Sequence, residues 1–403
     1  MVQKVTIENF KSIQYLELEL GRVNVLIGEN GSGKSNILEA IAMGSAAAED
    51  KLENQFLASR GIRTTDPKAM RAGFEKENSE KSIKMTFDTE ELRGLSFELK
   101  NDNTPFSEWV DLNKKIEREH FSTSFENFLE QDGYEANNLI KYNVKLTSFK
   151  PLIIEPEDSS DKAEASSIDM INSIIRKVLA KKNTFKNFLI FAPENHFLRR
   201  FEEESQIEPL GIRGEGLFKF ISTLSYEKPE LLQKIIENLE LIDWFEGFEI
   251  PTDLRFTERR IKIKDRFIEE GLTYFDQRSS NEGFLYLLFY FSLFVSDYTP
   301  HFFAIDNIDN AMNPKLVTRL IQQLAKMAKE HNKQIILTTH NPAVLDGLDL
   351  KDDEQRLFVV SRNALGHTKT LRITHKPASE GQEPVKLSEQ FLRGYIGGLP
   401  KNF

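Results

Sequence analysis

The sequence predicts an α/β fold, in which a mixed sheet is covered by helices and carries a helical insertion lobe. Two observations lead to this prediction. A glycine-rich turn at residues 28–35 lies between an apolar strand at 23–27 and a helix-forming run that begins at Asn36. Alternation of apolar strands and helices then returns in the last third of the chain, from His301 onward. Because parallel strands need crossover connections, usually helices, this alternation favours a sheet with helices on its faces.

Composition limits the classes of function. The 403 residues carry a formal charge of -10 and contain no cysteine, which excludes disulfides and cysteine-ligated metal sites. The longest apolar run, residues 284–295, is shorter than the roughly 20 residues that span a bilayer. The N-terminus also lacks the pattern of a secretory signal. We therefore expect a cytoplasmic protein without membrane segments, in which 284–295 forms a buried helix.

The N-terminal elements are short strands. Residues 2–8 and 13–20 are expected to form two strands joined by a turn, because the second alternates leucine with polar residues. A third strand at 23–27 leads into the glycine-rich turn. From about residue 50 to 190 the pattern loosens, with one expected strand at 82–87, and we interpret this region as an insertion.

The glycine-rich turn fits the phosphate-binding loop pattern at every fixed position. Its glycines let backbone N–H groups turn toward phosphate oxygens, Lys34 reaches the β- and γ-phosphates, and the Ser35 hydroxyl coordinates magnesium. The sequence therefore predicts a site for ATP and Mg²⁺. The loop residues expected to bind the nucleotide are Asn30, Gly31, Ser32, Gly33, Lys34 and Ser35.

A helical lobe is expected in the middle of the chain, since apolar residues recur at three- and four-residue spacing between about 215 and 245. This divides the chain into four predicted parts. They are an N-terminal head part at 1–75, an insertion region at 76–190, a helical arm at 191–250 and a C-terminal head part at 251–403.

Two apolar strands of the C-terminal part end in polar side chains. The strand before Asp306 places a carboxylate where magnesium beside a phosphate loop would be held. The strand at 335–339 ends in His340, which we predict faces the γ-phosphate. Between them, Asn313 and Pro314 predict the cap and the first residue of a helix.

Together, the motifs at 28–35, 302–306 and 338–342 resemble the ATPase heads of the ABC superclass. The branch they resemble is the overcoming-lysogenization and SMC-like group, often called AAA15 or AAA21 ATPases, whose opening is similar to Ile-Glu-Asn-Phe-Lys-Ser-Ile at 7–13. The resemblance covers about residues 1–45 and 185–403. It implies a P-loop ABC-ATPase head that forms a homodimer or a higher homo-oligomer, in which one subunit's phosphate loop faces a serine-glycine signature of the other.

The resemblance places this signature just before the apolar helix at 284–295. Gly283 takes the place of the signature glycine, Asn281 stands where the family has serine, and Ser280 lies one residue further away. Either polar side chain can donate a hydrogen bond to a neighbour's nucleotide. An ordinary capped helix start explains the same residues.

A departure from the family follows Asp306. Relatives have a glutamate there that polarises the attacking water, whereas this chain has Asn307. General-base assistance is typically worth 10²–10⁴-fold, so hydrolysis should be slow unless another carboxylate substitutes. Asp309 is the candidate for this carboxylate. The expected catalytic residues are therefore Asp306, His340 and Asp309. The alternative for Asp309 is a role in the loop or in a contact between subunits. A slow ATPase and an ATP-gated scaffold that seldom turns over both stay open.

The residues after His340 are too few for the nuclease domain that overcoming-lysogenization relatives carry. A compact head without an effector resembles the ATPase subunits of bacterial anti-phage defence systems, such as the Septu and PARIS types. That resemblance implies a separate toxic effector as partner, with a nuclease as the expected kind. The alternative is a DNA repair or maintenance ATPase of the SMC or RecF type, with DNA as partner. Alternating cations at 260–266 suit either a phosphate backbone or the wet face of a sheet.

Overall fold

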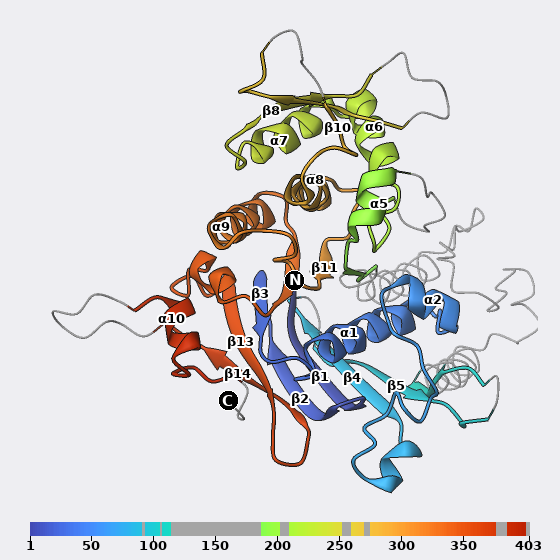
Figure 1. The fold of residues 1–403 in the computed structure, drawn as a ribbon. Helices are drawn as coiled ribbons and strands as arrows, with labels where there is room; N and C mark the ends of the chain where they lie inside the picture. The colour runs from blue at the N-terminus through green and yellow to red at the C-terminus, as the bar shows by residue number, and fades with distance from the viewer. Residues whose placement is uncertain are drawn as a thin grey trace, which may run out of the picture.

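The computed structural model describes residues 1–90, 93–104, 107–113, 187–201, 209–251, 259–269, 275–375 and 385–399. Most of the predicted insertion, residues 114–186, lies outside these ranges, as do the last four residues of the chain. The described elements stack in layers, with the lobe of α6, α7 and β8 at one end and the two larger sheets at the other (Figure 1).

A six-stranded mixed sheet holds the phosphate-loop strand, and its strand order is β14-β13-β3-β12-β11-β7. All neighbouring pairs are parallel except β13 with β14, so the predicted α/β fold with a mixed sheet is confirmed. Every residue of β3, β11 and β12 is buried, as expected for strands covered on both faces. The strands are β3 (Val23–Ile27), β7 (Ile190–Phe191), β11 (Phe302–Ile305), β12 (Gln334–Thr339), β13 (Gln355–Arg362) and β14 (Thr368–Ile373).

An antiparallel sheet of order β2-β1-β4-β5-β6 forms a second layer. Its strands are β1 (Val2–Phe10), β2 (Ile13–Glu19), β4 (Ile83–Thr89), β5 (Leu95–Lys100) and β6 (Val110–Asp111). The first two strands and β4 lie where the sequence predicted them. The last three fall in the region interpreted as an insertion, yet β4 pairs with β1 along most of its length. Periodicity identifies a strand but not its distant partner, so this pairing was not foreseen.

Two hydrophobic cores flank the mixed sheet because successive strand residues point to opposite faces. Leu26 of β3 belongs to the core that also contains α1 (Lys34–Ala48) and the antiparallel sheet. Its neighbours Val25 and Ile27 belong to the core with α8 (Glu282–Val295) and α9 (Pro314–Glu330). The phosphate-loop strand is therefore fixed from both sides.

The two helices on the second face differ in pattern, and each pattern has a packing cause. In α8, residues 283–295 are all buried, which confirms the expected buried helix. In α9 the buried stripe includes Val317, Leu320 and Leu324, and the opposite face is polar. The predicted cap of α9 is confirmed, since Asn313 Oδ1 accepts from the Leu316 N–H at 3.0 Å and Pro314 is the first helical residue.

The lobe contains the two helices that periodicity predicted, α6 (Leu217–Glu227) and α7 (Pro229–Leu239). It also has a three-stranded sheet of β8 (Phe245–Glu249), β9 (Lys262–Asp265) and β10 (Phe275–Asp276). On β9, Lys264 pairs with Glu246 of the neighbouring strand at 2.5 Å, and just beyond it Arg266 donates to the Phe245 carbonyl at 2.7 Å. Since two of these cations serve the lobe itself, the geometry favours the wet-face interpretation.

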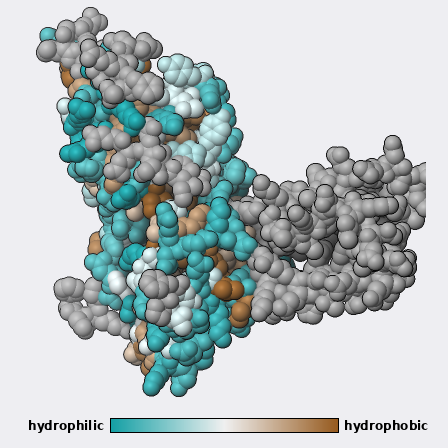
Figure 2. All heavy atoms as spheres, turned by 90° about the vertical axis from the view of Figure 1, so that its right-hand side faces the viewer, coloured by the Kyte–Doolittle hydropathy of each residue, from teal (hydrophilic) through white to brown (hydrophobic). Residues whose placement is uncertain are grey.

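Short elements complete the described chain. They are α2 (Asn54–Ser59), η1 (Lys76–Ser79), α5 (Asn195–Arg200), η3 (Pro342–Gly347) and α10 (Leu387–Leu392). No helix in the described ranges combines the length and apolar character that crossing a membrane requires. Figure 2 shows one face of the molecule, on which hydrophilic side chains predominate, in keeping with a mean hydropathy of -0.43.

Candidate functional site at the phosphate loop

The phosphate loop connects the end of β3 to α1, which begins at Lys34, two residues before the expected start at Asn36. Gly31 and Gly33 have left-handed backbones, with φ of 76° and 108°. A Cβ on Gly33 would come within 2.1 Å of Thr368 Oγ1. Conformation and space therefore both require glycine at position 33.

A cavity of about 320 Å³ opens at this loop. It collects residues from the ends of β3, β11 and β12, which are neighbours in the sheet, so that their carboxyl ends meet at one edge. The lining residues are Asn30, Gly31, Gly33, Lys34, Ser35, Asn36, Arg63, Asp306, Asn307, His340 and Arg362. The structure thus brings together most of the predicted nucleotide-binding residues. Ser32 is buried beside them, and its Oγ has no hydrogen-bond partner among the described residues.

Lys34 and His340 form the basic side of the cavity. Lys34 Nζ donates to the carbonyls of Gly28 at 2.9 Å and Glu29 at 3.0 Å, and lies 3.5 Å from His340 Nδ1. Burial lowers the pKa of Lys34 to about 8, although Asp306 and Glu29 oppose the shift. Burial, and then the neighbouring Lys34 charge, lower the pKa of His340 below its usual value. At pH 7 the pair is therefore a charged ammonium beside a neutral imidazole.

Asp306 forms the acidic side. Its Oδ2 lies 3.3 Å from Ser35 Oγ, and its Oδ1 accepts from the Thr338 hydroxyl. Among the described residues, no group of three or more His, Asp or Glu side chains could hold a metal alone. Mg²⁺ prefers one or two carboxylates with waters and phosphate oxygens. Ser35 and Asp306 fit that requirement, and the positive-φ glycines, the orphan Ser32 hydroxyl and Lys34 fit the phosphates.

Asn307 and Asp309 differ in their access to the cavity. Asn307 lines it with φ of 54°, a left-handed conformation that asparagine tolerates better than most residues, and its N–H donates to Thr338 Oγ1 at 3.0 Å. Asp309 does not line it, and its Oδ1 accepts from the Thr339 hydroxyl at 2.6 Å. A catalytic role for Asp309 stays a prediction, and the geometry favours its alternative loop role.

None of the signature residues lines the phosphate-loop cavity. Asn281 is exposed and caps α8, with its Oδ1 accepting from the Phe284 N–H at 2.8 Å. Ser280 is buried and donates to the Gln277 carbonyl at 3.0 Å, while Gly283 is buried in the first turn of α8. Of the two polar candidates, Asn281 is the one that can meet another subunit, and that contact stays a prediction.

Two arginines of the cavity were missed from the sequence. Arg362 ends β13, a neighbour of β3, so the strand-end reasoning applied to Asp306 and His340 would have found it. Arg63 lies beyond α2 in the loosely patterned region, where no sequence signal marks it. Both add positive charge where phosphates are expected.

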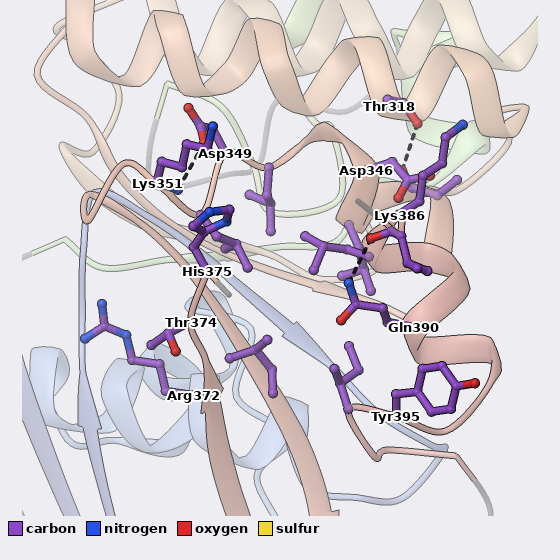
Figure 3. A pocket seen from close by; sticks show the side chains of 18 of the residues that line it. Thr318, Asp346, Asp349, Lys351, Arg372, Thr374, His375, Lys386, Gln390 and Tyr395 are labelled. Atoms are coloured by element: carbon purple, nitrogen blue, oxygen red, sulfur yellow. Dashed lines mark hydrogen bonds between the residues drawn. The ribbon is translucent and has the colours of Figure 1, made fainter. Parts of the chain in front are cut away.

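A larger groove of about 1340 Å³ lies elsewhere, between α9, η3, β14 and α10 (Figure 3). It contains none of the predicted site residues. Cations such as Lys351 and Lys386 line it together with Asp346, whose carboxylate accepts from the Ser388 N–H at 2.9 Å and hydroxyl at 2.7 Å. Size alone therefore does not locate the nucleotide chemistry.

Fold and site together define an α/β protein that carries a phosphate loop at the carboxyl edge of its mixed sheet. Within this class, the chain belongs to the family described as "AAA domain, putative AbiEii toxin, Type IV TA system", whose sequence profile matches residues 23–346. The resemblance to AAA21 ATPases is thereby confirmed at the level of family and fold.

Individual relatives are more distant. An uncharacterized protein of Methanocaldococcus jannaschii is 28% identical over 157 residues, which cover 37% of this chain and 70% of that protein. The DNA double-strand break repair Rad50 ATPase of Saccharolobus solfataricus is 33% identical over 61 residues, 15% of this chain and only 7% of the relative. The DNA replication and repair protein RecF of Rickettsia felis is 39% identical over 64 residues, 16% of this chain and 14% of the relative.

A solved structure supports the fold. The crystal structure of an SMC head bound to the C-terminal winged-helix domain of ScpA covers 93% of this chain and 98% of that chain, with a TM-score of 0.50 and 15% identity. At this identity the likeness shows the fold alone.

Proposed function

We propose that the protein binds MgATP in the phosphate-loop cavity, hydrolyses it slowly and uses it to assemble with further copies of itself. The observation that supports this most directly is the convergence of Lys34, Ser35, Asp306 and His340 on one cavity. Two of these side chains begin α1 and two directly follow β11 and β12, and they meet although up to 306 positions separate them in sequence.

Each of these residues has a role that its surroundings support. Lys34 binds the β- and γ-phosphates, exchanging its two loop carbonyl partners for phosphate oxygens. Ser35 and Asp306 would hold Mg²⁺, and bound MgATP supplies the phosphoryl group that is transferred to water. His340, neutral at pH 7, binds near the γ-phosphate. The Asn307 amide orients water but takes no proton, so turnover is slow.

The second part of the proposed site comes from another copy of the chain. Asn281 and Gly283, at the N-terminus of the 14-residue helix α8, contact the neighbour's nucleotide. A helix N-terminus presents backbone N–H groups and favours negative charge. ATP-dependent association into a homodimer or a higher homo-oligomer follows from this arrangement.

The biological role that we propose is control of a separate toxic effector in a bacterial anti-phage defence system of the Septu or PARIS type. The family description names a putative toxin of a type IV toxin–antitoxin system, which supports a link to toxicity, whereas the separate effector is our own proposal. A nuclease is the expected kind of effector. The alternative, a DNA repair or maintenance ATPase, draws support from the short matches to Rad50 and RecF, and a non-hydrolysing ATP-gated scaffold is the third candidate.

The biochemical part is tested by titrating MgATP into the wild type and Lys34→Ala. Two quantities are measured: the ATP affinity, and the oligomer size by light scattering. We expect wild type to bind and associate, and the variant to lose both. Equal ATP affinity in the two proteins would refute the site.

The biological part needs a separate test. Phage plating on cells that carry the gene with its genomic neighbours, as wild type or Lys34→Ala, should show protection only for wild type. Absence of protection, together with tight and salt-sensitive binding of duplex DNA by the purified protein, would favour the maintenance alternative.

A further inference from the structure

Glu39 is a buried carboxylate that binds two cations. It lies in the second turn of α1, the helix that begins with Lys34, and 2% of its side chain is exposed. Its Oε2 accepts from Lys11 Nζ, and its Oε1 accepts from Arg63 Nε at 2.5 Å. Burying a charge is costly unless it is paired, so a carboxylate in this position needs a structural or functional reason.

Arg63 is the partner of Glu39 that reaches the phosphate-loop cavity. Its side chain is 66% exposed, yet it is one of the cavity's lining residues. Glu39 takes the Nε–H, which leaves the terminal nitrogens for other partners, and Nη2 lies 3.5 Å from Asn36 Oδ1. A guanidinium fixed through Nε presents its two Nη groups in one plane, the geometry in which arginine binds phosphate oxygens.

Lys11 contacts the backbone of the segment that carries Arg63. Its Nζ donates to the Arg63 carbonyl at 3.0 Å, and its N–H donates to the Met70 carbonyl at 3.0 Å. Asn9, near the end of β1, and Lys11, in the turn before β2, have φ of 59° and 47°, and Asn9 Oδ1 accepts from the Ala72 N–H at 3.0 Å. The Asn-Phe-Lys-Ser turn therefore fixes the backbone of the loop that carries Arg63, and Glu39 fixes its side chain.

We infer that Glu39 is a positioning residue, which together with Lys11 orients the Arg63 guanidinium toward an anionic group of the nucleotide in the cavity. The inference rests on the proposed function and adds to it a part for the Asn-Phe-Lys-Ser turn. Without Glu39, Arg63 is a long exposed side chain that must be ordered by the ligand itself, and that ordering weakens binding.

A double-mutant cycle tests this inference, with ATP affinity measured by calorimetry in wild type, Glu39→Gln, Arg63→Ala and the double variant. We expect each single change to weaken ATP binding about tenfold, the loss typical of one hydrogen bond to a charged group. In the Arg63→Ala background, Glu39→Gln should cause no further loss. A loss from Glu39→Gln that is undiminished in that background would overturn the inference.

Glu49→Gln is the matched control. Glu49 follows the last turn of α1 and pairs with Arg60 at 2.5 Å, so the variant also breaks a largely buried ion pair, but Arg60 does not line the cavity. It should lower the melting temperature and leave ATP affinity unchanged. Arg63→Ala alters a mostly exposed side chain, so it stays informative if Glu39→Gln fails to fold. ATP affinity within twofold of wild type in Arg63→Ala would contradict the inference, whereas unchanged affinity in Lys34→Ala would overturn the proposed site itself.

Discussion

The phosphate-loop cavity and the signature end of α8 are two regions that the same family resemblance predicted, and they differ in completeness. At the cavity, the expected loop, carboxylate and histidine already touch: Ser35 contacts Asp306, and Lys34 contacts His340. At the signature, Asn281 and Ser280 contact only their own chain, as a helix cap and a turn donor. A single chain therefore builds the first region, whereas contact of the second region with a partner copy stays a prediction.

The difference has a physical origin. Neighbouring parallel strands bring their carboxyl ends together wherever the sheet forms, so strand-end side chains meet without any ligand. A helix N-terminus need not contact another element of the fold, because its cap residue can accept the free backbone N–H groups of the first turn. Binding affinity should thus respond to the cavity, and assembly should respond to the signature.

Asn307→Glu is the change with the largest expected effect, which is on ATP turnover in the cavity. A carboxylate can accept the proton that the amide cannot, so we expect ATP turnover to rise by roughly 10²–10⁴-fold. Because φ at 307 is 54°, Asn307→Gly is the control that keeps the backbone and adds no base. Phosphate release under saturating MgATP measures both. Fast wild-type turnover that glutamate does not increase would instead call for Asp309→Asn.

Asp306→Asn should remove the magnesium-dependent part of binding. Mutation of a residue that only supports a metal ligand typically lowers metal affinity 10–100-fold, so we expect loss of the ligand Asp306 to lower ATP affinity by at least about tenfold with Mg²⁺ present. With EDTA the variant and wild type should bind ATP equally. A defect of the same size under both conditions would mean that Asp306 acts through the fold of the loop.

The pH dependence of binding sharpens the comparison further. The pKa of Lys34 is lowered to about 8 by burial, and a bound phosphate stabilises the ammonium, so binding takes up a proton above that pH. ATP affinity should be constant near pH 7 and fall by up to about tenfold per unit above pH 8. Calorimetry in buffers of different ionisation enthalpy detects the proton. A flat profile would contradict the expected role of the Lys34 pKa, and a profile that Lys34→Arg leaves unaltered would assign the dependence to another group.

Asn281→Ala is expected to change the free energy of unfolding least among these variants. Its effect on association should be specific to this position. Loss of an N-cap costs about 1 kcal/mol. Asn313→Ala removes the equivalent cap of α9, where Asn313 Oδ1 accepts from Leu316 at 3.0 Å, and should cost the same stability. Only Asn281→Ala should weaken ATP-dependent association, as measured by light scattering. Equal association of the two variants would reduce Asn281 to a helix cap.

The sequence predicted those parts of the protein that depend on neighbouring residues. The phosphate loop needs consecutive glycines, Asp306 and His340 end apolar strands, and Asn313 precedes a helical stripe, so each carries its own local signal. The pairing of β4 with β1 and the arrival of Arg63 at the cavity depend on contacts between distant segments. Periodicity records which face of an element is buried, not what buries it, and these features were missed for that reason.

The position of β3 within its sheet bears on how the protein is made. Both neighbours of β3 come from the last quarter of the sequence: Val23 pairs with Ile335 of β12 and with Gln355 of β13. During synthesis, the phosphate loop is translated early but has no sheet to hold it until those strands leave the ribosome. A nascent chain therefore carries the nucleotide motif without a nucleotide site until β12 and β13 have been made, and ATP cannot stabilise the chain through this site before then.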